Sequence, residues 1–305
     1  MSKLNLKGIF PPIPTPFIKG KVAYDKLASN VEKWGKTGIR GFVVLGSNGE
    51  YVYLSEEEKR EAVKTVVNAA PGDMIIIVGA GCESTVETIR LTQDCSKLGA
   101  HAALIVTPSY YGGQMNAKAL IKHYTTIADD SSIPIVLYNV PKFTHINLGV
   151  DIAARLSKHP NIIGIKDSSG NVNQLGEYLN NVDEDFNVLV GTAGALLGAL
   201  TLGCAGGILA LANVAPESCV KIFNLVQDGN IEEAKKLQLK MIPVNKAITA
   251  TYGISGLKAA LDMVGYFGGE TRLPLLPLTE DEKREIEEIL EKGLSGYRKT
   301  FSARG

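Results

Sequence analysis

A lysine ends an otherwise apolar stretch in the sequence Ile-Ile-Gly-Ile-Lys-Asp-Ser-Ser-Gly, which runs from residue 162 to residue 170. The isoleucines and glycine predict a buried strand, so the ammonium group of Lys166 would be removed from water. Burial of an unpaired charge is costly and lowers the pKa of a lysine, which leaves more of the free amine. A free amine attacks a ketone to form an imine, and the protonated imine withdraws electrons so that an adjacent carbon–carbon bond can break or form. A plain structural explanation stays open, in which Lys166 reaches solvent or pairs with Asp167.

Other polar side chains stand at the ends of apolar runs. Tyr138 ends one of them, and a phenol beside an imine-forming lysine can carry protons, although a tyrosine there can also serve only for packing. Ser47 lies in Gly-Ser-Asn-Gly-Glu, a tight turn whose hydroxyl and N–H groups suit a carboxylate, although such residues are also ordinary turn formers. The remaining polar residues at these ends are Asn48, Tyr110, Tyr111, Asn139, Asp167, Thr192 and Asn213.

The elements that must position these side chains alternate between strand and helix. Apolar runs begin at Gly8, Gly41, Met74, Ala102, Pro134, Ile162, Asn187 and Gly206. Helical patterns lie between them, and two open with capping-box spacings at Ser55 and Ser84. Because no linker interrupts the alternation, we predict an α/β fold, a (β/α)8 TIM barrel, rather than an open doubly wound sheet. The barrel with the active site would span residues 1–227, and a C-terminal helical region would span 228–305, with helices over 231–251, 255–264 and 279–299.

In such barrels the chemistry lies at the C-terminal ends of the strands. Alternation along a strand places Ile162, Gly164 and Lys166 on one face, and it places Tyr138 inward on its own strand. If these faces point into the barrel, Lys166 and Tyr138 project from adjacent strands toward one point. Gly164 would then leave room for the lysine stem.

The composition favours a small molecule as the ligand. Lysine plus arginine and aspartate plus glutamate both total 32 in 305 residues, so no net charge favours nucleic acid or a membrane surface. The four cysteines show no metal-binding or disulfide spacing, and the four histidines are scattered, which predicts surface or loop positions. Gly-Ala-Gly at 79–81 lacks the further glycine and acidic residue of a dinucleotide site, and Gly35-Lys36-Thr37 follows no strand. We therefore expect no metal and no cofactor, and the N-terminal residues predict a cytoplasmic protein.

Four motifs together resemble those of a known family. GSNGE at 46–50, TPSYY at 107–111, YNVP at 138–141 and GIKDSSG at 164–170 stand in the order and spacing of the dihydrodipicolinate synthase/N-acetylneuraminate lyase family of class I aldolases. The resemblance covers nearly the whole chain. It implies a TIM barrel with C-terminal helices that binds pyruvate or another 2-oxo acid as a Schiff base, and a homotetramer built from dimers.

The resemblance also implies roles for single residues. Lys166 matches the imine-forming lysine and Tyr138 matches the proton-shuttling tyrosine. Ser47 matches the hydroxyl of the proton relay and, with Asn48, the turn that binds the carboxylate. Tyr111 matches a residue that the family lends across a dimer interface to the neighbouring site, so dimerisation would be required for full activity.

Within the family the chain is most similar to 4-hydroxy-2-oxoglutarate aldolase, through GSNGE, GCEST from Gly81, HPNIIGIKDSSG from His159, LANV from Leu211 and GLKAALDMVGYFGG from Gly256. That similarity adds Ser168 and Gly191 to the substrate-binding residues. The first hypothesis is therefore cleavage of a 4-hydroxy-2-oxo acid, such as 4-hydroxy-2-oxoglutarate, to pyruvate and glyoxylate.

A second hypothesis keeps the Schiff base but changes the reaction. It is a dihydrodipicolinate synthase type condensation of pyruvate with aspartate semialdehyde, or a reaction of 2-oxo-3-deoxy sugar acids. Phe143 stands where the synthases carry an arginine that binds a substrate carboxylate, which disfavours the synthase. A third hypothesis is a non-catalytic sensor of 2-oxo acids, disfavoured because both Lys166 and Tyr138 are present.

Overall fold

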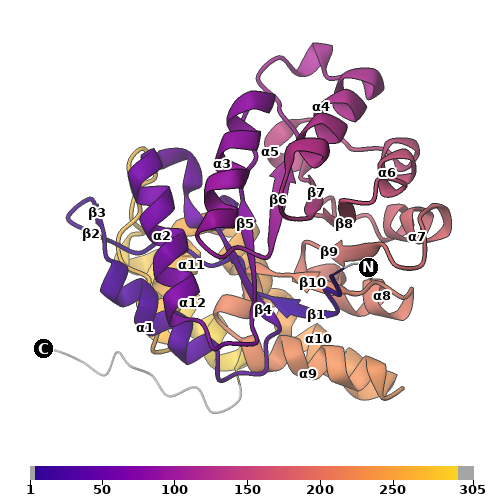
Figure 1. Cartoon of the computed structure of the whole chain (residues 1–305). Coiled ribbons are helices and arrows are strands. Elements are labelled where there is room, and N and C mark those ends of the chain that lie inside the picture. The colour runs from indigo at the N-terminus through magenta and orange to yellow at the C-terminus, as the bar shows by residue number, and fades with distance from the viewer. Residues whose placement is uncertain (1–3, 295–305) are drawn as a thin grey trace, which may run out of the picture.

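Eight parallel strands form a nearly closed barrel in the computed structural model of the chain, which describes residues 4–294 (Figure 1). The strand order is β1-β10-β9-β8-β7-β6-β5-β4, and a parallel bridge between Pro12 and Val43 joins the continuation of β1 to β4. The predicted TIM barrel is confirmed, and each of the eight apolar runs contributes one strand.

The strands of the barrel are β1 (Gly8–Phe10), β4 (Gly41–Val44), β5 (Ile75–Gly79), β6 (Ala102–Val106), β7 (Ile135–Asn139), β8 (Ile162–Asp167), β9 (Asn187–Val190) and β10 (Gly206–Ile208), and a small hairpin is formed by β2 (Phe17–Ile18) and β3 (Lys21–Val22). The barrel helices are α1 (Tyr24–Trp34), α2 (Glu56–Ala69), α3 (Thr85–Lys97), α4 (Ala117–Asp130), α5 (Pro141–Thr144), α6 (Val150–Ser157), α7 (Val172–Asn181), α8 (Leu196–Thr201) and α9 (Pro216–Gln227). The predicted capping box is present at α2, where Ser55 and Glu58 each bind the other's backbone N–H.

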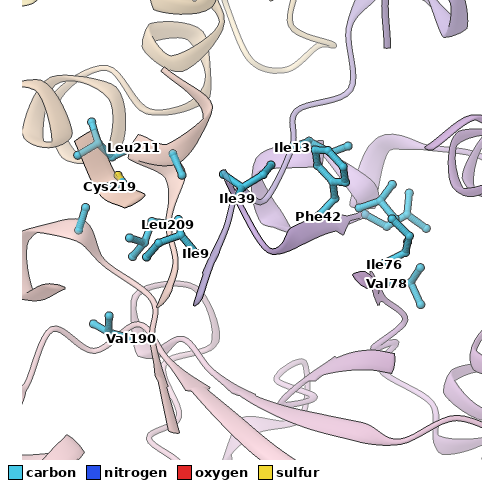
Figure 2. Packing of buried hydrophobic residues seen from close by; sticks show 14 of the residues in the cluster. Ile9, Ile13, Ile39, Phe42, Ile76, Val78, Val190, Leu209, Leu211 and Cys219 are labelled. Carbon is cyan, nitrogen blue, oxygen red and sulfur yellow. The ribbon is translucent and has the colours of Figure 1, made fainter. Parts of the chain in front are cut away.

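Two apolar layers separate the inside of the barrel from its helical coat. The inner layer contains side chains such as Val43, Ile77, Leu104 and Leu189, while a larger outer layer packs between strands and helices. Figure 2 shows part of the outer layer. Side chains that point outward from the strands therefore cannot reach a ligand in the mouth of the barrel. Only side chains that point inward can meet there.

The predicted alternation along β8 is wrong at its start. The register between β7 and β8 shifts at Ile135/Val136, so Ile162 packs in the outer layer and Ile163 packs in the inner one. A bulge adds one residue to a strand and reverses the facing of every residue before it. Beyond the bulge Lys166 pairs with Tyr138 as predicted. The space beside Gly164 is occupied by Asn187 rather than by the lysine stem, since a Cβ at Gly164 would lie 2.5 Å from the Asn187 carbonyl oxygen.

The C-terminal helices pack on the barrel and on one another. They are α10 (Ile231–Lys246), the π-helix η6 (Ala247–Thr251), α11 (Gly253–Met263) and α12 (Glu280–Gly293). Helix α10 contacts α9, and α12 contacts α10 and α11. The predicted end of the last helix at Lys299 lies outside the described residues, and the division of the chain at residue 227 stays a prediction. In residues 4–294 no helix has the length and apolarity needed to cross a membrane.

One histidine departs from its predicted surface position. His123 on α4 is buried, and its Nδ1 lies 2.8 Å from Thr85 Oγ1. Burial lowers the pKa of His123 to about 4. His123 thus lies in the packing between α3 and α4, where burial favours the neutral ring.

Candidate active site

Lys166 and Tyr138 form the centre of the candidate site. They are paired residues of β8 and β7, both are buried, and Lys166 Nζ lies 4.0 Å from the centre of the Tyr138 ring. No ion pair involving Lys166 is present within residues 4–294. The two side chains point into the barrel from adjacent strands, as the sequence predicted, and the amine and the phenol can therefore act on one bound molecule.

Ser47 approaches the same phenol from the turn after β4. Its Oγ lies 3.5 Å from the Tyr138 hydroxyl, and this hydroxyl pair borders a small cavity of about 10 Å³ that also touches Tyr51 and Gly79. The turn is a 3-10 helix, η1 (Ser47–Gly49), whose first hydrogen bond is donated by Gly49 N–H to the Gly46 carbonyl. The turn itself therefore does not use the N–H groups of Ser47 and Asn48. The Asn48 side chain donates to the Pro12 carbonyl at 3.4 Å, which attaches the turn to the continuation of β1.

The phenol of Tyr138 is tuned by its neighbours. Burial would raise its pKa, but the charge of Lys166 and hydrogen bonds with Ser47, Lys166 and Ser168 together lower that pKa below its usual value. A buried phenol with a lowered pKa releases and regains a proton more readily near neutral pH than an ordinary tyrosine does. The environment thus favours proton transfer at this hydroxyl.

Ser168 and Gly191 lie together beside the lysine. A Cβ at Gly191 would lie 1.9 Å from Ser168 Oγ, so only glycine leaves room for this serine. Gly191 N–H also donates to the Asp167 carbonyl at 2.7 Å, and Ser168 N–H donates to the Asn139 carbonyl at 2.9 Å. The ends of β7, β8 and β9 are held in register, which fixes the position of Ser168, the serine that the resemblance adds to the substrate-binding residues.

Asp167 faces away from the site and does not pair with Lys166. Its carboxylate accepts hydrogen bonds from Ser169, from Asn139 Nδ2 at 3.1 Å and from Gln174 Nε2 at 3.3 Å. Burial raises the pKa of Asp167, and these hydrogen bonds only partly offset the effect. Because successive residues of a strand point to opposite faces, Asp167 anchors β8 to α7 while Lys166 points inward.

Three residues predicted at strand ends are not brought to Lys166. The Tyr111 ring is 67% exposed and packs edge-on against Tyr110, with ring centres 5.1 Å apart. Tyr111 is also absent from the cavity beside Ser47. Asn213 is buried and donates to the Pro12 carbonyl at 3.1 Å, so it supports the end of β1.

One buried ion pair next to the site was not predicted. Glu50, directly after the Ser47–Gly49 turn, lies with its Oε1 2.5 Å from Lys258 Nζ on α11, and both side chains are 1% exposed. A sequence signal existed, because Lys258 interrupts an apolar helical stretch, Gly-Leu-Lys-Ala-Ala-Leu, much as Lys166 interrupts its strand. What the sequence lacked was any indication of its partner, which lies more than 200 residues away.

The barrel with a lysine and a tyrosine at the ends of adjacent strands has the arrangement of a class I aldolase. The model of the Dihydrodipicolinate synthetase family matches residues 5–293. A 4-hydroxy-tetrahydrodipicolinate synthase of Methanothrix thermoacetophila is 38% identical over 288 residues, covering 94% of this chain and 96% of the relative. The enzyme of the same name from Thermodesulfovibrio yellowstonii is 38% identical over 287 residues, covering 93% and 97%.

Solved structures agree with the sequence comparisons. The crystal structure of a chloride-inhibited dihydrodipicolinate synthase from Acinetobacter baumannii, complexed with pyruvate, superposes with a TM-score of 0.90. It is 32% identical, and the match covers 94% of this chain and 99% of that one. The chain belongs to the dihydrodipicolinate synthetase family and is a carbon–carbon lyase of the class I aldolase type.

Proposed function

We propose that Lys166 forms a Schiff base with C2 of pyruvate or of a longer 2-oxo acid. The amine adds to the ketone, the carbinolamine loses water, and the resulting iminium draws electrons from C3. In one direction the C3–C4 bond breaks, an aldehyde leaves and the remaining enamine takes a proton at C3. In the other direction the enamine attacks an aldehyde. The observation that carries this proposal is the buried amine of Lys166 lying 4.0 Å from the Tyr138 ring.

Proton transfers in these steps are assigned to Tyr138 and Ser47. The Tyr138 phenol has a lowered pKa, and its hydroxyl lies 3.5 Å from Ser47 Oγ, so protons can pass between the two hydroxyls. The N–H groups of Ser47 and Asn48 suit the carboxylate of the 2-oxo acid. We assign Ser168, beside Gly191, to substrate binding as well. The pyruvate bound in the Acinetobacter baumannii relative supports this class of ligand.

Exchange of the methyl protons of pyruvate tests the proposal without any aldehyde. In deuterated buffer the enamine takes up deuterium at C3, and proton NMR follows the loss of the methyl signal. Wild-type protein is expected to catalyse the exchange, and the Lys166→Met variant is expected not to. Equal exchange by both proteins would contradict the proposed role of Lys166.

The favoured aldehyde is aspartate semialdehyde, condensed with pyruvate. Its support comes from relatives that are named 4-hydroxy-tetrahydrodipicolinate synthase. Each of them matches this chain over more than nine-tenths of both chains. Initial rates of pyruvate uptake with aspartate semialdehyde measure this activity directly. Turnover of 4-hydroxy-2-oxoglutarate with no uptake of aspartate semialdehyde would overturn this choice.

Cleavage of 4-hydroxy-2-oxoglutarate is the second candidate, and Phe143 favours it. This ring is 57% exposed on α5, four residues beyond the end of β7, and offers no positive charge to a substrate carboxylate. Lys142 beside it donates to the Thr249 carbonyl at 3.3 Å and lies 5.7 Å from the Phe143 ring centre. A Phe143→Arg variant, compared with Phe143→Leu as the control, separates the candidates. A gain in aspartate semialdehyde condensation only with arginine would show that wild type lacks this carboxylate contact.

We further propose a homotetramer built from dimers, in which a second copy of the chain supplies Tyr111 to each site. The exposed rings of Tyr110 and Tyr111 support it, because large exposed aromatics mark surfaces that a partner covers. Mixing inactive Lys166→Met protein with Tyr111→Phe protein tests the sharing of sites. Recovery of activity on subunit exchange is expected, and no recovery despite exchanged subunits would contradict it.

A further inference from the structure

The turn that carries Ser47 has a backbone shape that its own residues do not favour. Leu45 and Glu50, on either side of it, adopt left-handed conformations with φ of 59° and 53°. Side chains other than glycine, asparagine and aspartate rarely occupy this region, and they do so where surrounding contacts hold them. The position of Ser47 therefore depends on the contacts that hold these two flanking residues.

Glu50 is gripped by the C-terminal helical region. One carboxylate oxygen lies 2.5 Å from Lys258 Nζ on α11, and the other accepts the Arg272 N–H at 2.9 Å. Lys258 in turn donates to the Glu270 carbonyl at 2.6 Å and lies 4.4 Å from the Phe17 ring centre. Glu50, the residue that follows the turn, is thus bonded to groups more than 200 positions later in the chain.

The other contacts on this turn are neutral. Thr15 Oγ1 donates to the Gly49 carbonyl at 2.7 Å, and Asn48 Nδ2 donates to the Pro12 carbonyl at 3.4 Å. A charged pair removed from water rarely increases stability over well-packed apolar residues, and one established use of such pairs is to fix a single geometry. The Glu50–Lys258 pair lies directly after Ser47, Asn48 and Gly49, so the geometry that it can fix is that of this turn.

We propose that Glu50 and Lys258 are positioning residues for the reaction, and that their ion pair holds Ser47 within reach of the Tyr138 hydroxyl. The C-terminal helix α11 then affects the reaction through the position of Ser47. This inference rests on the proposed proton-transfer role of Ser47.

The test uses the full chain and compares three variants: Glu50→Gln/Lys258→Met, Ser47→Ala, and the two combined. The first removes both charges together, so no unpaired charge stays buried. We expect kcat to fall about tenfold in each of the first two, since small displacements of catalytic groups are costly. The limb of the kcat/KM pH profile that reports ionisation of Tyr138 should also move to higher pH in both variants, because each loses the Ser47 hydrogen bond. The combined variant should show no additional loss and no additional shift, as expected for residues acting through one contact.

A matched control removes another ion pair that joins two elements. Arg60→Gln/Asp94→Asn breaks the pair between α2 and α3 and should leave both kcat and the limb unchanged. An unmoved limb in Glu50→Gln/Lys258→Met, or additive effects in the combined variant, would overturn the positioning role. If the double variant does not fold, Glu50→Asp, which keeps both charges but shortens the side chain that reaches Lys258, is read in the same way.

The proposed function fails separately from this inference. Absence of deuterium exchange into pyruvate by wild-type protein would contradict the Schiff base itself. A second outcome is normal exchange by wild-type protein together with a Ser47→Ala variant whose kcat and pH limb are both unchanged. It would contradict the role of Ser47 and therefore also the positioning role. Normal exchange with a limb that moves only in Ser47→Ala would contradict the positioning role alone.

Discussion

Lys166 and Lys258 are two lysines in closely similar surroundings that do different things. They are 4% and 1% exposed, and each ammonium nitrogen lies over an aromatic ring, 4.0 Å from the centre of Tyr138 and 4.4 Å from that of Phe17. The difference is the partner. Lys258 has the Glu50 carboxylate at 2.5 Å, whereas Lys166 has no ion pair within residues 4–294 and faces a phenol instead.

The difference teaches that burial alone does not identify a reactive lysine. Burial lowers the pKa of Lys258, but the Glu50 charge and hydrogen bond offset part of that effect, and its nitrogen contacts both Glu50 and the Glu270 carbonyl. Such a lysine is structural. A buried lysine whose neighbour is a proton carrier, at the open end of a barrel strand, is placed for chemistry.

The largest expected effect is the loss of the chemistry of Lys166. Lys166→Met should lower kcat/KM by on the order of 10⁴-fold or more, because no other group can form the imine. The thermal midpoint should not fall, since the polar side chain that is removed is buried and makes no ion pair within residues 4–294. Steady-state kinetics and calorimetry on the same preparation check both parts, and a large fall in the midpoint would assign Lys166 a structural role.

Lys258→Met should show the opposite pattern in stability. It leaves the Glu50 carboxylate buried without its partner, which should lower the free energy of unfolding by about 3–5 kcal/mol. Adding Glu50→Gln should restore most of that loss. Denaturant unfolding measures both values, and equal stability of wild type and Lys258→Met would break the contrast between the two lysines.

Removing only the phenol should have an intermediate effect. Tyr138→Phe keeps the ring beneath Lys166 but lacks the proton carrier, so kcat should fall by about 10²-fold or more while the imine still forms slowly. Single-turnover trapping of the imine, compared with steady-state rates, separates these steps. An unchanged kcat would show that another group carries the protons.

The smallest effect concerns pH. The Ser47 hydrogen bond is one of the interactions that lower the pKa of Tyr138, so the corresponding limb of the kcat/KM profile should lie below the usual phenol value of 10.0. Ser47→Ala removes that bond and should move the limb upward by up to about one pH unit, or ~1.4 kcal/mol. A limb that moves downward would contradict the role assigned to Ser47.

Local patterns in the sequence predicted most of the barrel. The eight apolar runs became the eight strands, and the meeting of Lys166 with Tyr138 followed from the parity of adjacent strands. The same parity rule was wrong for Ile162, because the bulge in β8 depends on how β7 packs against it and leaves no mark in the local pattern.

Contacts between distant segments could not be predicted from the sequence. Glu50 looked like part of an ordinary turn, but it has a left-handed conformation, and its ion-pair partner Lys258 lies on a C-terminal helix more than 200 residues later. The role of Tyr111 in a neighbouring site stays a prediction, since within one chain its ring is exposed. The resemblance supplied roles for single residues but gave no indication of the Glu50–Lys258 pair next to Ser47.

Reduction with borohydride in the presence of pyruvate tests the central claim most directly, because it converts an imine to a stable amine on the lysine that formed it. Peptide mass mapping of the treated wild-type protein should find the added pyruvate-derived mass on Lys166 and leave the peptide with Lys258 unmodified. An adduct on Lys258, or an active protein with Lys166 unmodified, would contradict the account.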